Sequence, residues 1–190
     1  MIYYLNSLPA ASGDKVVIAD FDFTESLTDK VNGFTSSLNG GATRDSNGVH
    51  ITAASQYLRI NSLFGLLSLK LCTFELDIGN MELINSSTHN RFFMFDVSNG
   101  FIYRNNGHWN VYAGTGWKTD GETDPNIFKN SKCIIKMSRD NSFKVYKNNT
   151  LVYGTTIPGT ISGSNNFFIG SETQSFYNLD IKSLKIYIES

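Results

Sequence analysis

The stretch from Lys132 to Glu172 contains four short apolar runs separated by turn-forming residues. The runs cover positions 133–137, 143–146, 150–153 and 167–169, and they are rich in β-branched and aromatic side chains. Runs of this length and composition, bounded by Asn, Asp and Gly, are typical of antiparallel strands. Asn148 and Asn149 separate the second run from the third, and Asn tolerates the left-handed conformation that a tight turn needs. The stretch therefore predicts a β-hairpin within an antiparallel sheet.

The rest of the chain repeats this pattern and shows no long helical period. In Val16–Phe23, period two places Phe21 and Phe23 on one face and Asp20 and Asp22 on the other. One helical turn is expected within 61–69, and everything else indicates an all-β fold. The residues expected to contribute to its core are Phe21, Phe23, Leu58, Phe74, Leu76, Phe93, Ile134, Val145, Ile169, Leu184 and Ile186.

The order of these features resembles a known family. A strand, an Asn turn, a second strand, a loop and then Phe-Phe-Ile-Gly-Ser at 167–171 is similar to the laminin-G-like, concanavalin A-like jelly roll, and 179–187 resembles that family's closing strand. The resemblance covers roughly Val16 to Ser190. It implies a two-sheet antiparallel jelly-roll sandwich over residues 16–190, preceded by an N-terminal arm, residues 1–15. Because the superfamily holds both lectins and glucanases, the resemblance implies the fold more than the function.

The amino-acid composition argues against some classes of function. The chain has 190 residues, a net charge of −1 and 17% charged residues, so one domain with a sizeable core is expected. Sixteen Lys and Arg against seventeen Asp and Glu argue against a nucleic-acid binder, which needs a basic surface. No signal peptide and no membrane-spanning stretch are visible. Cys72 and Cys133 each lie in an apolar run, which favours buried thiols.

One strand resembles a catalytic motif. Glu75 and Asp77 match the first two carboxylates of the E-x-D-x-x-E strand of the concanavalin A-like glucanases, where the first Glu is the nucleophile and the last is the general acid. Alternation puts Glu75 and Asp77 on one face, as a retaining pair requires. The third position is Asn80, whose amide can neither donate nor accept the catalytic proton, and Glu82 comes two residues too late unless a bulge realigns it. We therefore expect an ordinary core strand and no hydrolase activity.

The segment Phe101–Tyr112 predicts a hairpin about Asn106-Gly107. A two-residue loop pairs Arg104 with Trp109 and Tyr103 with Asn110, which places Trp109 on one face with Ile102 and Val111. The other face then carries Phe101, Tyr103, Asn105, His108, Asn110 and Tyr112. Aromatic rings stack on pyranoses and amides bind their hydroxyl groups, so this second face is a candidate glycan site. In the alternative that remains open, Phe101, Tyr103 and Tyr112 pack the core and Trp109 faces outward.

The loop 113–125 adds a second candidate. Trp117 lies between Gly116 and Lys118 without periodic partners, so it is expected either to bind a ligand from an exposed loop or to cap the open end of the sandwich.

Few residues in the sequence match a metal site or a catalytic triad. The acids Asp120, Glu122 and Asp124, like Asp20 and Asp22, are oxygen ligands of the kind calcium prefers, but they complete no known loop pattern, so no cofactor or metal is predicted. The histidines at 50, 89 and 108 are scattered and predict no metal site or catalytic triad.

Three functions follow from these observations. The leading hypothesis is a non-catalytic, lectin-like domain that binds glycan or cell-surface polysaccharide through Tyr103, Asn105, His108, Asn110, Tyr112 and Trp117. The rivals are a structural protein that binds protein neighbours in a larger assembly and a laminarinase-like hydrolase. A plain Met1 without an export signal suggests a virion component, such as a phage tail, fibre or capsid-decorating protein, held by its arm and contacting host glycans. The alternative setting is a module cut from a larger extracellular enzyme or adhesin.

Overall fold

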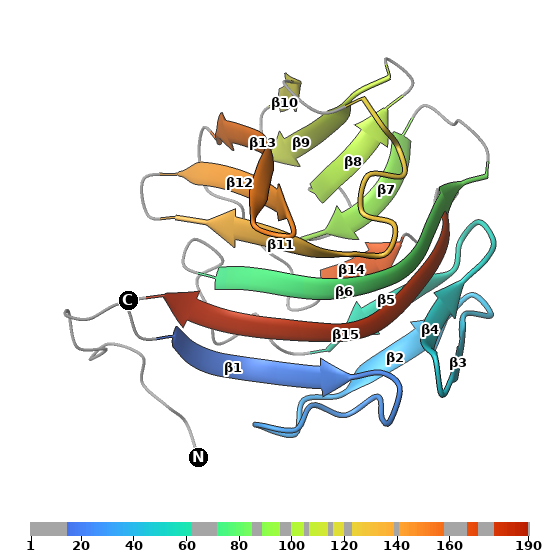
Figure 1. The fold of residues 1–190 in the computed structure, drawn as a ribbon. Coiled ribbons are helices and arrows are strands. Elements are labelled where there is room, and N and C mark those ends of the chain that lie inside the picture. The colour runs from blue at the N-terminus through green and yellow to red at the C-terminus, as the bar shows by residue number, and fades with distance from the viewer. Residues whose placement is uncertain are drawn as a thin grey trace.

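The computed structural model shows two antiparallel β-sheets packed face to face (Figure 1). The residues that it describes are 15–61, 72–84, 89–95, 100–104, 107–113, 116–119, 123–138, 141–157, 167–170 and 177–189. Within these residues the chain forms fifteen strands and no helix. The predicted all-β, two-sheet jelly-roll sandwich is therefore confirmed.

The first sheet has eight strands. They are β1 (Lys15–Asp22), β3 (Thr43–Asp45), β4 (Gly48–Ile51), β6 (Cys72–Leu83), β11 (Ser131–Met137), β12 (Ser142–Lys147), β13 (Thr150–Thr156) and β15 (Tyr177–Glu189). Their order across the sheet is β13-β12-β11-β6-β15-β4-β3, and β1 also pairs with β15. One edge of β15 pairs with β6, while β4 and β1 share the other edge, at 179–181 and 183–189. The last strand in the sequence thus lies at the centre of this sheet.

The second sheet has seven strands. They are β2 (Ser36–Asn39), β5 (Tyr57–Ile60), β7 (His89–Met94), β8 (Gly100–Arg104), β9 (Trp109–Ala113), β10 (Gly116–Thr119) and β14 (Phe167–Gly170). Their order is β10-β9-β8-β7-β14-β5-β2. Inward-facing residues of both sheets meet in one core, and the opposite surface of the second sheet is called its outer face below.

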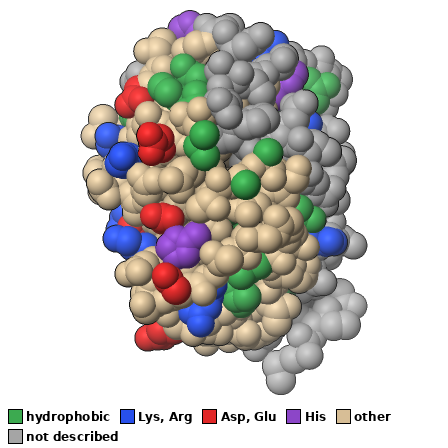
Figure 2. All heavy atoms as spheres, turned by 90° about the vertical axis from the view of Figure 1, so that its right-hand side faces the viewer, with side chains coloured by type: hydrophobic (Ala, Val, Ile, Leu, Met, Phe, Trp, Pro, Cys, Tyr) green, Lys and Arg blue, Asp and Glu red, His purple; other side chains and the backbone are tan. Residues whose placement is uncertain are grey.

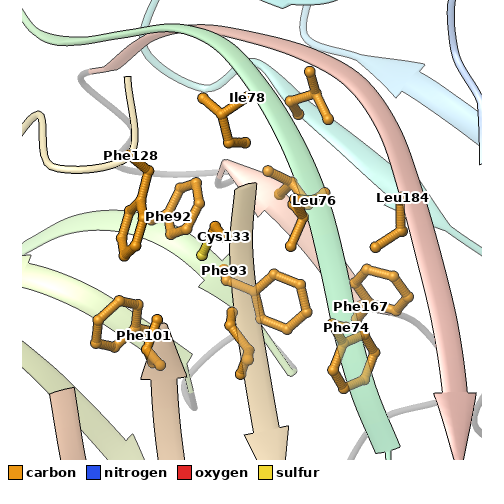
Figure 3. Packing of buried hydrophobic residues seen from close by; sticks show 14 of the residues in the cluster. Phe74, Leu76, Ile78, Phe92, Phe93, Phe101, Phe128, Cys133, Phe167 and Leu184 are labelled. Atoms are coloured by element: carbon orange, nitrogen blue, oxygen red, sulfur yellow. The ribbon is translucent and has the colours of Figure 1, made fainter. Parts of the chain in front are cut away.

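The core between the sheets is rich in aromatic side chains (Figure 3). Phe74 from the first sheet meets Phe93 and Phe167 from the second, with ring centroids 5.0 and 5.5 Å apart. All eleven predicted core residues are buried. Ile134 is the exception in position, because it pairs with Glu75 and lies outside the inter-sheet cluster although it is only 7% exposed.

The hairpin predicted at Asn148-Asn149 is confirmed. Lys147 pairs with Thr150 across a two-residue loop, and both asparagines have positive φ, 46° and 71°. A type I′ turn requires this conformation at both central positions, and its twist matches that of the flanking strands. The Asn148 side chain also accepts a hydrogen bond from the Lys132 backbone at 2.9 Å, which fastens the turn to β11.

Several predictions lie partly or wholly outside the described residues. The expected N-terminal arm falls on undescribed residues 1–14 and on Lys15, which begins β1, so the proposed domain boundary stays a prediction. The helical turn expected within 61–69 falls there too, apart from Asn61.

Both cysteines are buried free thiols, as predicted, and burial raises the pKa of Cys72 to about 12. In the described ranges, no helix has the length and apolar character needed to cross a membrane.

Candidate functional site

The hairpin of β8 and β9 carries most of the predicted site, and its register differs by one residue from the prediction. The pairs are Gly100 with Tyr112, Phe101 with Val111, Ile102 with Asn110 and Tyr103 with Trp109. The Arg104 amide donates to the His108 carbonyl, and the Gly107 amide, whose residue has a φ of 80°, donates to the Arg104 carbonyl. Three residues therefore separate Arg104 from His108, and the last of them, Gly107, is left-handed. The predicted two-residue loop is wrong.

In the observed register, two large aromatic side chains lie together in the core. Trp109 is fully buried, and its indole nitrogen donates to the Asp124 carbonyl at 2.9 Å. The Tyr103 hydroxyl donates to the Thr123 carbonyl at 2.8 Å, and its ring packs edge-on against Trp109 at 5.6 Å. Tyr103 was predicted to face a glycan beside Tyr112, and the alternative put Trp109 outside. The first arrangement is wrong for Tyr103. The alternative is right that Phe101 and Tyr103 pack the core and wrong for Trp109 and Tyr112, because a one-residue shift in register exchanges the partners across the hairpin.

Three of the predicted residues, His108, Asn110 and Tyr112, lie on the outer face, whereas Phe101 packs in the core. His108 and Tyr112 are half-buried. Asn110 is fully buried, and its amide donates to the His108 carbonyl at 2.6 Å, so it fixes the end of β9. Trp117 belongs to β10, where its backbone pairs with Tyr112, but its side chain lies outside the described residues, as does Asn105.

The outer face also gathers basic side chains that the sequence analysis did not assign to the site. His89 on β7 pairs with Arg104 on β8, and Arg91 pairs with Ile102 one step along. Burial, then the positive charges of Arg104 and Arg91, lower the pKa of His89 below its ordinary value. We call His89, Arg91 and Arg104 the basic cluster. The signal for it was the spacing of His89 and Arg91, two positions apart at the start of an otherwise apolar strand.

An apolar floor continues from the basic cluster across the outer face. Met94, Ile102 and Phe168 form a second buried cluster, separate from the inter-sheet core, with Tyr57 packed against it. Any side chain at Gly100 would meet the Met94 sulfur and the Phe93 carbonyl, so the glycine lets Met94 lie across β8. This outer face therefore combines nitrogen donors, aromatic rings and apolar side chains.

The strand that resembles a glucanase motif shows a different environment. The Glu75 carboxylate forms an ion pair with Lys132 at 2.7 Å, and Lys185 is its partner in the register with β15. The hydrogen bond to Glu75 raises the pKa of Lys132. Asn80 makes a long contact, 3.5 Å, from its side-chain amide to the Asn178 carbonyl. Glu75 thus lies among lysines on the outer surface of the first sheet.

The acidic residues that were considered as oxygen ligands for calcium have other partners. Asp20 pairs with Lys185 at 3.1 Å, while Asp22 accepts hydrogen bonds from Thr24 and Lys30. The Asp124 side chain accepts from the Asn126 amide. Asp120 and Glu122 lie outside the described residues. Across the part of the chain that the structure describes, no group of three acidic, His or Cys side chains is placed to hold a metal.

His50 joins three strands of the first sheet. Its Nδ1 lies 2.7 Å from Asp180 on β15, and its Nε2 lies 2.9 Å from Asp45 on β3. The hydrogen bonds to Asp45 and Asp180 raise the pKa of His50, while the bond to His50 lowers the pKa of Asp45. Figure 2 shows acidic, basic and histidine side chains interspersed on this side of the molecule. The arrangement is an ion-pair clamp that holds β3 and β4 to β15.

Comparison with known proteins identifies the fold but no family. No family model matches the chain, and no curated protein matches it either. Solved structures do. Domain 4 of AbnA, a GH43 extracellular arabinanase from Geobacillus stearothermophilus solved with arabinotriose, is 17% identical with a TM-score of 0.66, over 92% of this chain and 93% of that one.

Two further structures match at similar levels. The ligand-binding domain of botulinum neurotoxin serotype D, in complex with N-acetylneuraminic acid, is 14% identical with a TM-score of 0.63, over 92% of this chain and 48% of that one. The sialidase of Trypanosoma rangeli in complex with sialic acid is 13% identical with a TM-score of 0.63, over 90% and 30%. The chain thus spans about half of the neurotoxin domain and under a third of the sialidase. At these identities the likeness establishes the β-sandwich fold.

Proposed function

We propose that this protein is a non-catalytic glycan-binding domain whose binding surface is the outer face of the second sheet. The observation that carries the proposal is the half-buried Tyr112 lying on the same face as His108 and the basic cluster. An aromatic ring offers a stacking surface for a sugar, and nitrogen donors bind its hydroxyl groups. Asn110 supports this surface from within, since its amide is already used by the His108 carbonyl.

The similar structures support a carbohydrate ligand without identifying one. The arabinanase domain was solved with arabinotriose, and the neurotoxin domain and the sialidase with N-acetylneuraminic or sialic acid. Those ligands belong to those proteins. They favour a glycan over a protein or nucleic acid as the first class of ligand to test on this fold.

Replacing the aromatic platform tests the proposal. Tyr112→Ala is expected to weaken binding to oligosaccharides that the natural protein retains on a glycan array, by about 1 kcal/mol or more. Tyr146→Ala is the matched control, because Tyr146 is also half-buried but lies on the outer surface of the first sheet, beside Lys136. Isothermal titration of both variants measures the effect. Equal affinities for the two variants, or no glycan bound by the natural protein, would reject the proposed site.

The same proposal implies that the protein does not hydrolyse glycosides. Glu75 is held by Lys132, and Asn80 occupies the position that carries the general acid in the glucanase motif that this strand resembles. A reducing-sugar assay with β-glucans is expected to give no turnover. Measurable turnover that disappears in Glu75→Gln would show that the strand is catalytic after all.

The biological setting belongs to the proposal as well. A virion or other extracellular surface would bring the outer face to host glycans while protein neighbours hold the domain. The exposed Leu151 on β13, an edge strand of the first sheet, is a surface that such a neighbour could cover.

A further inference from the structure

Charge is divided unequally between the two sheets. The eight strands of the first sheet contain eight Asp or Glu and eight Lys or Arg. The seven described strands of the second sheet contain four Lys or Arg and no Asp or Glu. A protein with a net charge of −1 thus has one sheet whose strands carry positive charge only.

Most of this positive charge lies on the outer face. Arg59, Arg91 and Arg104 are three of the five arginines in the chain. Arg91 and Arg104 belong to neighbouring strands and are half-buried. Arg59 lies on β5, with its guanidinium 5.9 Å from the ring of Phe168. A guanidinium presents a planar set of donors that matches a carboxylate or sulfate, and it stays charged in partly buried positions.

The electrostatic potential around His89 is positive. Arg104 and Arg91 both act to lower the pKa of His89, in addition to burial. A cation is disfavoured there, and by the same electrostatics an anion is favoured. On the first sheet, by contrast, lysines lie beside carboxylates, as in the Lys132–Glu75 and Lys185–Asp20 pairs.

We propose that the outer face of the second sheet selects acidic glycans, with Arg91 and Arg104 donating hydrogen bonds to a carboxylate or sulfate group while Tyr112 packs against the sugar ring. This inference rests on the proposed glycan-binding function and specifies its ligand class. The pairing of β7 with β8 sets Arg91 and Arg104 on one surface, and the pairing of β8 with β9 brings Tyr112 to the same surface.

A polyanion such as nucleic acid is the weaker fit to the same charges. Binding along a phosphate backbone draws on many basic residues, whereas the strands of this sheet supply four and the chain as a whole is slightly acidic. Two arginines beside an aromatic ring suit a single acidic sugar.

The test compares lactose with two acidic derivatives of it: sialyllactose adds a sugar that bears a carboxylate, and sulfated lactose adds only a sulfate group. Lactose, sialyllactose and sulfated lactose share a neutral core, and isothermal titration with the full chain gives their dissociation constants. Sialyllactose or sulfated lactose is expected to bind at least tenfold more tightly than lactose, and the two acidic sugars separate carboxylate from sulfate recognition. A DNA duplex and vesicles of phosphatidylserine serve as polyanions that lack the lactose core.

Substitutions then assign the effect to the arginines. Arg91→Gln and Arg104→Gln are each expected to weaken binding of the acidic sugar about tenfold and to weaken lactose binding far less, so that the preference for the acidic sugar is lost. Lys144→Gln, on the exposed surface of the first sheet, removes the same charge and is expected to change neither affinity. Arg91→Lys keeps the charge, so it reports on the guanidinium if a glutamine variant fails to fold.

The outcomes separate this inference from the function on which it rests. Preference for an acidic sugar that is lost in the glutamine variants supports the inference. Equal binding of lactose and the acidic sugars overturns it but leaves glycan binding standing. Absence of binding to any glycan overturns both, and tighter binding to DNA or vesicles than to every sugar replaces the glycan with a polyanion.

Discussion

His50 lies between two carboxylates, and both of its ring nitrogens face an acceptor. A neutral imidazole can donate from only one nitrogen, so the arrangement favours the doubly protonated form. This agrees with the raised pKa of His50. Because the partners come from β3 and β15, protonation of one side chain ties a peripheral hairpin to the central strand of the first sheet.

The clamp makes stability depend on pH in one direction. A group whose pKa is raised in the folded state stabilises the protein fully below its unfolded pKa, about 6.5 for His. That contribution is lost as the pH rises through the higher folded pKa. In urea unfolding, His50→Gln should therefore lower the midpoint more at pH 5.5 than at pH 8.5. An NMR titration should place the folded pKa of His50 above 6.5, and an equal loss at both pH values would rule out the clamp.

Glycines at the ends of strands decide how closely neighbouring elements approach. Gly48 begins β4 with a φ of 123°, and any side chain there would meet the carbonyl of Ile181 on β15. Gly33 also has a positive φ, 72°, but a methyl group added there would meet no atom of the described residues within 4 Å. A residue with a side chain would be strained at both positions, but only at Gly48 would it also lack space.

This pair gives a matched test of the contact between β4 and β15. Gly33→Ala is expected to cost about 1 kcal/mol, from the strain of a left-handed alanine. Gly48→Ala is expected to cost roughly 1–3 kcal/mol more, because the backbone of β15 must move. Free energies of unfolding from urea titrations of both variants measure the difference. Equal losses would show that β15 yields easily at Ile181.

A turn or strand could be predicted from the sequence where the residues that determine it are adjacent in the chain. Asn148 and Asn149 specify their turn directly, and the predicted two-residue turn between Lys147 and Thr150 is present. At Asn106-Gly107 the same type of signal fits a two-residue loop and a three-residue loop equally well. The structure uses the longer loop, with Gly107 as its left-handed residue, and this shift of one position sends Tyr103 to the core.

The basic cluster could not be read from one segment for a related reason. His89 and Arg91 belong to β7, while Arg104 belongs to β8, so their proximity depends on strand pairing. The bulge between Arg91 and Phe93 then lets Phe92 and Phe93 both enter the core. Strict alternation along the apolar run would have placed one of them outside.

At the scale of the whole molecule, the sequence predicted the sandwich and ten residues of its inter-sheet core but not which strands share a sheet. Period-two patterns mark a buried face, and they do so equally in either sheet. Successive strands such as β4 and β5 belong to different sheets, whereas β6 and β15, far apart in the sequence, are neighbours. The unequal charge of the two sheets appears only once each strand is assigned.

The position of β15 also bears on how the chain is made. Lys15 and Tyr187, joined across β1 and β15, are 172 positions apart. A ribosome adding about 5–20 residues per second needs roughly 10 to 30 seconds to cover that distance. During this interval β1, β4 and β6 are synthesised in turn, and each of them waits for the strand with which all three pair. Their open edges can pair with other nascent chains, so slow translation or crowded polysomes would favour aggregation, and chaperones that cover strand edges would matter most before the last thirteen-residue strand emerges.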